Sequence, residues 1–232
     1  MPKYCYNCGV ELNKTNWTKE HIPAQCLFDG YDETYKLNRI TVPGCKKCND
    51  EYAKIDQEIR DVLAIKNDDV TQKSELTKKG IRSILSKANW KDRVFMDEHG
   101  KPTSFDFSYS DLKQIHIKNF KALFVKKYRV IVPEKFQIEI IADGDENLIA
   151  TAQVIHDYLT HDNKWKVSGH KDIFKFILKD ITINNEQTVF AESGDLSKAT
   201  AVAGLLVYHD EVGAVVVAGD KDFILSCKPA DM

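Results

Sequence analysis

Two short cysteine motifs constrain this chain more than any other feature. Cys5 and Cys8 frame the first CxxC pair, in CYNCG, and Cys45 and Cys48 frame the second, in GCKKC. Two cysteines separated by two residues can hold one Zn²⁺ from a tight turn, with each sulfur about 2.3 Å from the metal. Gly9, directly after the first pair, suits such a turn. The sequence therefore predicts a structural zinc site with four thiolate ligands, which leaves no open coordination position for a substrate.

The cysteine distribution also bears on the compartment. Five of the six cysteines lie within the first 48 residues, and clustered cysteines in a reducing compartment are metal ligands more often than disulfides. The opening MPKYC has no apolar stretch typical of a signal peptide, and no run approaches the roughly 18 apolar residues that span a bilayer. We therefore expect a cytoplasmic protein without a membrane partner. Cys26 is expected to be a small buried thiol beside Leu27 and Phe28 rather than a fifth ligand.

Charged residues divide the chain into three segments. Residues 1–60 hold 9 basic and 9 acidic side chains, residues 61–128 hold 14 and 9, and residues 129–232 hold 10 and 17. The overall net charge of -2 excludes a globally basic nucleic-acid coat, but the middle segment is basic and the last is acidic. The expected domains are 1–64, a zinc domain; 65–128, a basic helical region; and 129–232, an acidic α/β domain of unknown function.

Apolar periodicity predicts an α+β fold. Residues 45–63 have apolar positions at helical spacing, and residues 76–88 and 112–124 show the same pattern, whereas residues 89–107 resemble a loop. From residue 129 the pattern changes to short β-type runs with one helix. The expected strands cover 129–132, 136–141, 174–183, 189–192, 205–208, 214–217 and 223–225, and the expected helix covers 148–159.

The segment between the cysteine pairs carries a resemblance to a known family. CYNCG, EHIP and GCKKCN, as they stand here, resemble the HNH endonucleases whose ββα-metal motif is held by a four-cysteine zinc. The resemblance covers about residues 5–60 and implies a treble-clef zinc domain that hydrolyses DNA phosphodiester bonds. It assigns the water-activating base to His21, and it assigns the ligands of a catalytic Mg²⁺ or Mn²⁺ to Glu20 and Asn49. Bacterial or phage restriction and defence are common settings for this family.

One position departs from the family pattern. The middle Asn of the motif falls on Ile40, and the nearest asparagine, Asn38, lies two residues away. The bracing of the loop that this Asn provides therefore has no assigned residue. The other assignments agree with general chemistry, because an imidazole with a pKa near ~6.5 is a competent base at neutral pH and hard oxygen ligands suit Mg²⁺.

Several basic residues are candidates for contact with nucleic acid. Lys46 and Lys47 sit at the expected helix start, where an anion is favoured, although a solvated lysine pair explains them equally well. The middle segment adds a group of basic side chains that would give salt-sensitive affinity for DNA, namely Lys78, Lys79, Arg82, Lys118, Lys121, Lys126 and Lys127. DNA is the expected partner and RNA the alternative substrate.

Two interpretations remain open at the level of function. A non-catalytic treble-clef module that binds nucleic acid or protein needs the same zinc but not His21. The acidic C-terminal domain is expected either to contact another protein or a second copy, or to cover the basic surface. His156, His161 and His170 are expected to be ordinary exposed histidines, since their spacing does not form a ligand pair on one helix face.

Overall fold

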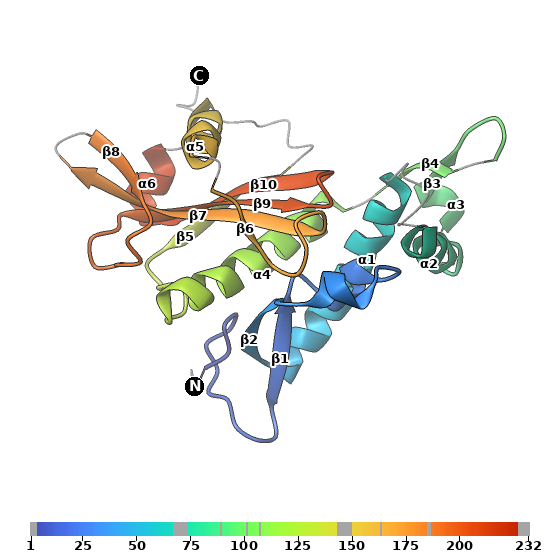
Figure 1. Ribbon diagram of the computed structural model, residues 1–232, viewed down its shortest axis with the longest axis horizontal. Coiled ribbons are helices and arrows are strands. Elements are labelled where there is room, and N and C mark those ends of the chain that lie inside the picture. Colours follow the sequence, from blue (N-terminus) through green and yellow to red (C-terminus); the bar gives the residue numbers. More distant parts are fainter. Residues whose placement is uncertain are drawn as a thin grey trace.

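The protein is an α+β chain in which a small N-terminal unit of two strands and a long helix packs beside a larger sheet (Figure 1). The computed structural model describes residues 4–66, 74–88, 90–100, 102–106, 108–142, 150–162, 164–184 and 187–226. The α-helices are α1 (Lys46–Lys66), α2 (Ser74–Leu85), α3 (Trp90–Arg93), α4 (Tyr109–Tyr128), α5 (Ala150–Thr160) and α6 (Lys221–Ser226), and the 3-10 helices are η1 (Gln25–Phe28) and η2 (Glu33–Lys36). The strands are β1 (Trp17–Ile22), β2 (Ile40–Cys45), β3 (Val94–Met96), β4 (Pro102–Phe105), β5 (Gln137–Ala142), β6 (Lys166–Val167), β7 (Phe174–Asn184), β8 (Gln187–Ala191), β9 (Ala201–Tyr208) and β10 (Val212–Gly219).

The N-terminal unit consists of two strands followed at once by a long helix. β1 and β2 are antiparallel, with Trp17 opposite Cys45 and Ile22 opposite Ile40. The helix α1 starts at the residue after β2, so the second cysteine pair spans the strand end and the first helical turn. The expected helices over 45–63 and 76–88 are confirmed as α1 and α2.

The C-terminal part is built on an antiparallel sheet with the order β5-β10-β9-β7-β6, and β8 also pairs with β7. α4 covers one face of this sheet, and α5 and α6 cover the other (Figure 1). On β10, Ala214 and Val216 belong to the core on the α4 side, whereas Val215 and Val217 belong to the core on the α5 side. Burial on both faces explains why the sequences of β9 and β10 are almost continuously apolar.

α4 joins the two parts of the molecule. Its Phe120 and Leu123 belong to a single buried cluster that also contains Cys5 and Val42 of the N-terminal unit and Phe174 of the sheet. Ser108 caps the start of this helix, and its side chain accepts a hydrogen bond from the Asp111 amide. Because one core runs from the N-terminal unit through α4 to the sheet, groups on α4 can reach sites in both parts. No helix in the described ranges is long and apolar enough to cross a membrane.

Three sequence predictions of local structure were wrong. Residues 129–132 are not a strand, because α4 ends with Arg129 in the left-handed region at φ 65° and Pro133 follows shortly after. Residues 223–225 lie in α6, where the Asp220 side chain accepts from the Phe223 amide and so caps a helix start. The loop expected over 89–107 contains α3 and the β3–β4 hairpin.

Candidate metal centre and its surroundings

The four CxxC sulfurs converge on one point. The ligand atoms of Cys5, Cys8, Cys45 and Cys48 all lie within 4.8 Å of one another, and Cys8 Sγ is 3.7 Å from Cys45 Sγ. A tetrahedral Zn²⁺ with Zn–S bonds of ~2.3 Å places neighbouring sulfurs about 3.8 Å apart. The donor set and its spacing therefore fit a four-thiolate zinc site, as the sequence predicted.

Backbone geometry positions these sulfurs. Gly9 closes the turn after the first pair, with φ at +71° and its amide bonded to the Cys5 carbonyl at 3.0 Å. The Tyr6 amide donates to the Pro43 carbonyl at 3.1 Å, which ties this turn to β2. Amides also point at sulfur: the Cys45 amide lies 3.4 Å from Cys5 Sγ, and the Cys48 amide lies 3.4 Å from Cys45 Sγ. Such N–H donors stabilise the thiolate form that a metal requires.

A second layer of polar groups reaches the thiolates from α4. Asn7 Nδ2 donates to Cys48 Sγ at 3.3 Å, and Lys121 Nζ donates to Asn7 Oδ1 at 3.3 Å. Burial lowers the pKa of Lys121, although the thiols of Cys48, Cys5 and Cys8 act in the opposite direction. Lys121 thus places a positive charge near the sulfurs without binding any of them directly.

Glu20 lies in a different environment from the one that the resemblance implies. Its carboxylate faces the interior and binds Lys118 of α4, whose Nζ lies 2.8 Å from Glu20 Oε1. The same Nζ lies 2.6 Å from Asp56 Oδ2. Burial raises the pKa of Glu20, and Lys118 opposes that shift. Asn49 is half-buried on the first turn of α1, and among the described contacts it makes no hydrogen bond with Glu20. As they stand, Glu20 and Asn49 do not fit a prepared divalent site, since an ammonium group already binds the carboxylate.

His21 follows Glu20 on β1 and faces the opposite side of the strand pair. Its ring is half-buried, and Nδ1 is buried and has no hydrogen-bond partner among the described residues. Burial, Arg39 and Lys19 together lower the pKa of His21, so the imidazole is neutral at neutral pH. Arg39, just before β2, likewise has a buried Nη1 without a partner, and its guanidinium stacks 5.3 Å above the Phe28 ring. Arg39 was not among the residues predicted from the sequence, although it directly precedes Ile40, on which the middle residue of the motif falls.

Ser168 braces the strand pair near His21. Its hydroxyl accepts from the Ile40 amide at 2.8 Å and donates to the Ile22 carbonyl, so it links the paired ends of β1 and β2. The next residue, Gly169, has φ at +78° and packs directly against the Phe28 ring. A side chain would not fit there, because a Cβ would lie 2.7 Å from that ring. A side chain from the C-terminal part of the chain thus holds the paired ends of β1 and β2 together. Asn38 is exposed, at a positive φ of 56°.

The basic residues of the middle segment divide into internal and exposed groups. Lys118 and Lys121 bind the N-terminal unit, and Lys127 pairs with the buried Asp180 at 2.8 Å. The exposed group consists of Lys78, Lys79, Arg82 and Lys126, together with Lys46 and Lys47 at the start of α1. The basic surface is therefore smaller than the charge count of the sequence suggested.

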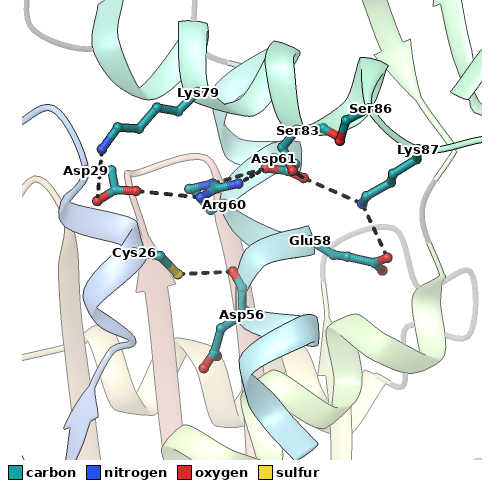
Figure 2. Close-up of polar contacts among 10 residues, drawn as sticks. All are labelled: Cys26, Asp29, Asp56, Glu58, Arg60, Asp61, Lys79, Ser83, Ser86 and Lys87. Carbon is teal, nitrogen blue, oxygen red and sulfur yellow. Dashed lines mark hydrogen bonds and ion pairs between the residues drawn. The ribbon is translucent and has the colours of Figure 1, made fainter. Parts of the chain in front are cut away.

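Asp56 belongs to the polar side of α1. Figure 2 shows its backbone oxygen facing Cys26, whose thiol donates to it at 3.4 Å, while the carboxylate turns away. Further along α1, Arg60 binds Asp61 at 2.6 Å, and Lys87 lies 3.5 Å from the same buried carboxylate (Figure 2). Each of these α1 carboxylates has a cationic partner from the protein. Burial raises the pKa of Cys26 to about 12, and this thiol lies outside the group of four sulfurs that converge on one point.

The remaining histidine candidates are ordinary side chains. His161 is exposed next to Asp162, and His156 is partly exposed next to Asp157. His170 is half-buried rather than exposed as expected, because its ring packs in a tilted arrangement against Tyr35, with ring centroids 3.9 Å apart. Comparisons with protein-family models, with curated proteins and with solved structures give no match for this chain. The assignment of a four-cysteine metal site therefore rests on the residues and on their geometry alone.

Proposed function

We propose that this protein is a zinc-stabilised nuclease of the HNH type that hydrolyses phosphodiester bonds in DNA, with His21 as the general base. The observation that carries the proposal is the pair of unpartnered polar atoms beside the strand ends, His21 Nδ1 and Arg39 Nη1. A neutral imidazole can accept a proton from water, and a guanidinium N–H without a protein acceptor can bind a phosphate oxygen.

Each group has a separate task in this proposal. His21 takes the proton of the attacking water, and its neutral state at neutral pH supports that role. Arg39 and Lys19, whose charges act on His21, attract the phosphate and offset the negative charge that develops during attack. The four-thiolate site keeps β1, β2 and α1 in place, and Ser168 holds the strand ends in register.

A second candidate is the non-catalytic treble-clef module that binds nucleic acid or protein. The contact of Lys118 with Glu20 favours it, because the carboxylate that the resemblance gives to a divalent ion is already neutralised. Both candidates require the zinc, and they differ in what His21 does.

The test is cleavage of supercoiled plasmid, and of an RNA of the same sequence, with Mg²⁺, Mn²⁺ or EDTA. Wild-type protein is compared with His21→Ala and with His161→Ala, a matched control at an exposed histidine. If His21 is the base, cleavage falls by ~10²-fold or more in His21→Ala only, while zinc content and circular dichroism stay unchanged. Equal cleavage by His21→Ala would remove His21 as the base, whereas zinc-loaded protein that binds nucleic acid but never cuts it would establish the binding module instead.

A further inference from the structure

The Glu20–Lys118–Asp56 contact joins three elements at a buried point. The carboxylates come from β1 and α1, and the ammonium comes from α4, with Nζ at 2.8 Å and 2.6 Å from the two oxygens. The three side chains are 6%, 12% and 1% exposed for Glu20, Asp56 and Lys118. The Tyr52 ring closes one side, with its centroid 5.4 Å from Nζ. This is the geometry of a small cation held between two carboxylates.

The charges explain why this cation is retained. Two buried carboxylates without a counter-ion would repel each other and lose their hydration, so the pair requires a positive charge. Burial works against the charged form of Lys118, but Asp56 and Glu20 outweigh it and raise the pKa of the ammonium. A divalent ion that approached the same oxygens would meet a positive charge within hydrogen-bond distance of both.

The position of Lys118 is fixed by its helix. Phe120 and Phe124 of α4 are fully buried, Asn119 donates to the Tyr208 hydroxyl at 2.6 Å, and Lys127 binds Asp180. Withdrawal of the ammonium therefore requires either a rotamer change that leaves it buried and unpaired or a shift of α4 against both parts of the molecule.

From this geometry we propose that Lys118 is a tethered cation that occupies the Glu20–Asp56 carboxylate pair and closes it to divalent metal ions. The side chain that shares this cation with Glu20 is Asp56, and not Asn49, which the resemblance pairs with Glu20. This inference rests on the proposed function only in the role that it gives to Glu20 of the HNH-type motif. The two can be tested separately, because cation binding is measured without any cleavage. A nuclease that fails to cut leaves this inference intact, and a failure of the inference leaves the role of His21 intact.

The test is Mn²⁺ binding by full-length, zinc-loaded protein, measured from the electron paramagnetic resonance signal of free Mn²⁺ and from Tm. The variant Lys118→Met removes the ammonium and keeps the length of the side chain. We expect its Tm to fall by roughly 10 °C without Mn²⁺ and to recover with millimolar Mn²⁺, alongside one new site that binds at least about tenfold tighter than any in wild type.

Two controls separate this site from adventitious Mn²⁺ binding. Lys127→Met removes another α4 lysine, but Asp180 keeps the Tyr128, Ser193 and Gly194 donors, so no Mn²⁺ site should appear. The triple variant Lys118→Met, Glu20→Gln, Asp56→Asn should fold and lack the new site.

Either of two results would overturn the proposal. The first is wild-type protein that binds Mn²⁺ as tightly as Lys118→Met and loses that binding on Glu20→Gln with Asp56→Asn. The second is the absence of any Mn²⁺-dependent rise in Tm both in Lys118→Met and in Lys118→Gln, which keeps a donor group if the methionine variant folds poorly.

Discussion

α4 faces two clusters of negative groups in the N-terminal unit, and its lysine side chains contact the two clusters in different ways. At the thiolate cluster, Lys121 stops short of the sulfurs and acts through the amide of Asn7. At the carboxylate cluster, Lys118 enters the centre and binds Glu20 and Asp56 directly. In the first case the four sulfurs remain available to a metal ion, and in the second the protein supplies the cation itself. The comparison shows that the chemistry of a buried anionic cluster depends on how far the nearest cationic side chain reaches.

Loss of a thiolate should have the largest effect. In Cys45→Ser the tetrahedral set is broken at the junction of β2 and α1, so zinc binding and the fold of residues 4–66 should be lost together. Structural zinc contributes apparent binding free energies of roughly 10–16 kcal/mol in small zinc domains, which exceeds the stability of most domains. Zinc content by atomic absorption and circular dichroism measure both losses. Cys26→Ser, outside the cluster, should retain one zinc per chain; loss of zinc in that variant instead would contradict the four-cysteine assignment.

The thiolate cluster could be predicted from sequence because its information is local. The two-residue spacing of each CxxC pair is enough to predict that both sulfurs bind one metal ion. Gly9 and the start of α1, which position the sulfurs, lie within a few residues of the pairs. The carboxylate cluster could not be predicted, because its cation lies 62 residues from Asp56 along the chain and was counted among the basic surface residues. A helical pattern indicates which residues share a face but not what that face meets.

Long-range contacts account for the other omissions. Ser168 braces Ile22 from 146 residues away, and nothing in its own sequence neighbourhood indicates that role. The strand expected at 223–225 was wrong because three apolar residues fit a strand or a helix equally well. There, Asp220 decides the structure by capping the Phe223 amide. Tertiary partners and caps thus decide the cases in which periodicity is too short to choose.

His116 is a third basic group of α4, and it is buried with no counter-ion among the residues that the structure describes. It lies two residues before Lys118 and is fully buried, and within the described part of the chain neither ring nitrogen has a hydrogen-bond partner. Burial lowers the pKa of His116 to about 3, whereas an unfolded histidine has a pKa near ~6.5. Between these two pKa values the imidazole is protonated in the unfolded chain but not in the folded one. The contribution of His116 to the free energy of unfolding is therefore fully present above about pH 6.5 and decreases as the pH falls toward 3.

We expect His116 to contribute a loss of about 1.4 kcal/mol in unfolding free energy between pH 7.5 and pH 5.5, a window chosen to limit acid release of zinc. Urea unfolding at the two pH values measures the loss. In His116→Phe, which keeps a ring against Tyr208, the pH dependence should be smaller by about that amount. His161→Phe, at an exposed position, should leave it unchanged. An equal pH dependence in wild type and His116→Phe would show that another group accounts for the loss.

The smallest effect is expected at Lys121, and it tests the other half of the comparison. Lys121→Met removes a charge that acts through Asn7, so all four sulfurs stay in place. The free energy of unfolding should therefore change by less than about 1 kcal/mol. Loss of an outer-shell partner should still weaken the metal, with zinc transfer to a chelator roughly tenfold faster. Lys121→Arg, which keeps the charge, should restore most of the retention. Unlike Lys118→Met, Lys121→Met should gain no Mn²⁺ site, because removing a cation that stands outside a cluster vacates no position within it. Unchanged zinc transfer in Lys121→Met would mean that the Asn7 amide alone supports Cys48, and that the two lysines differ in kind and not only in reach.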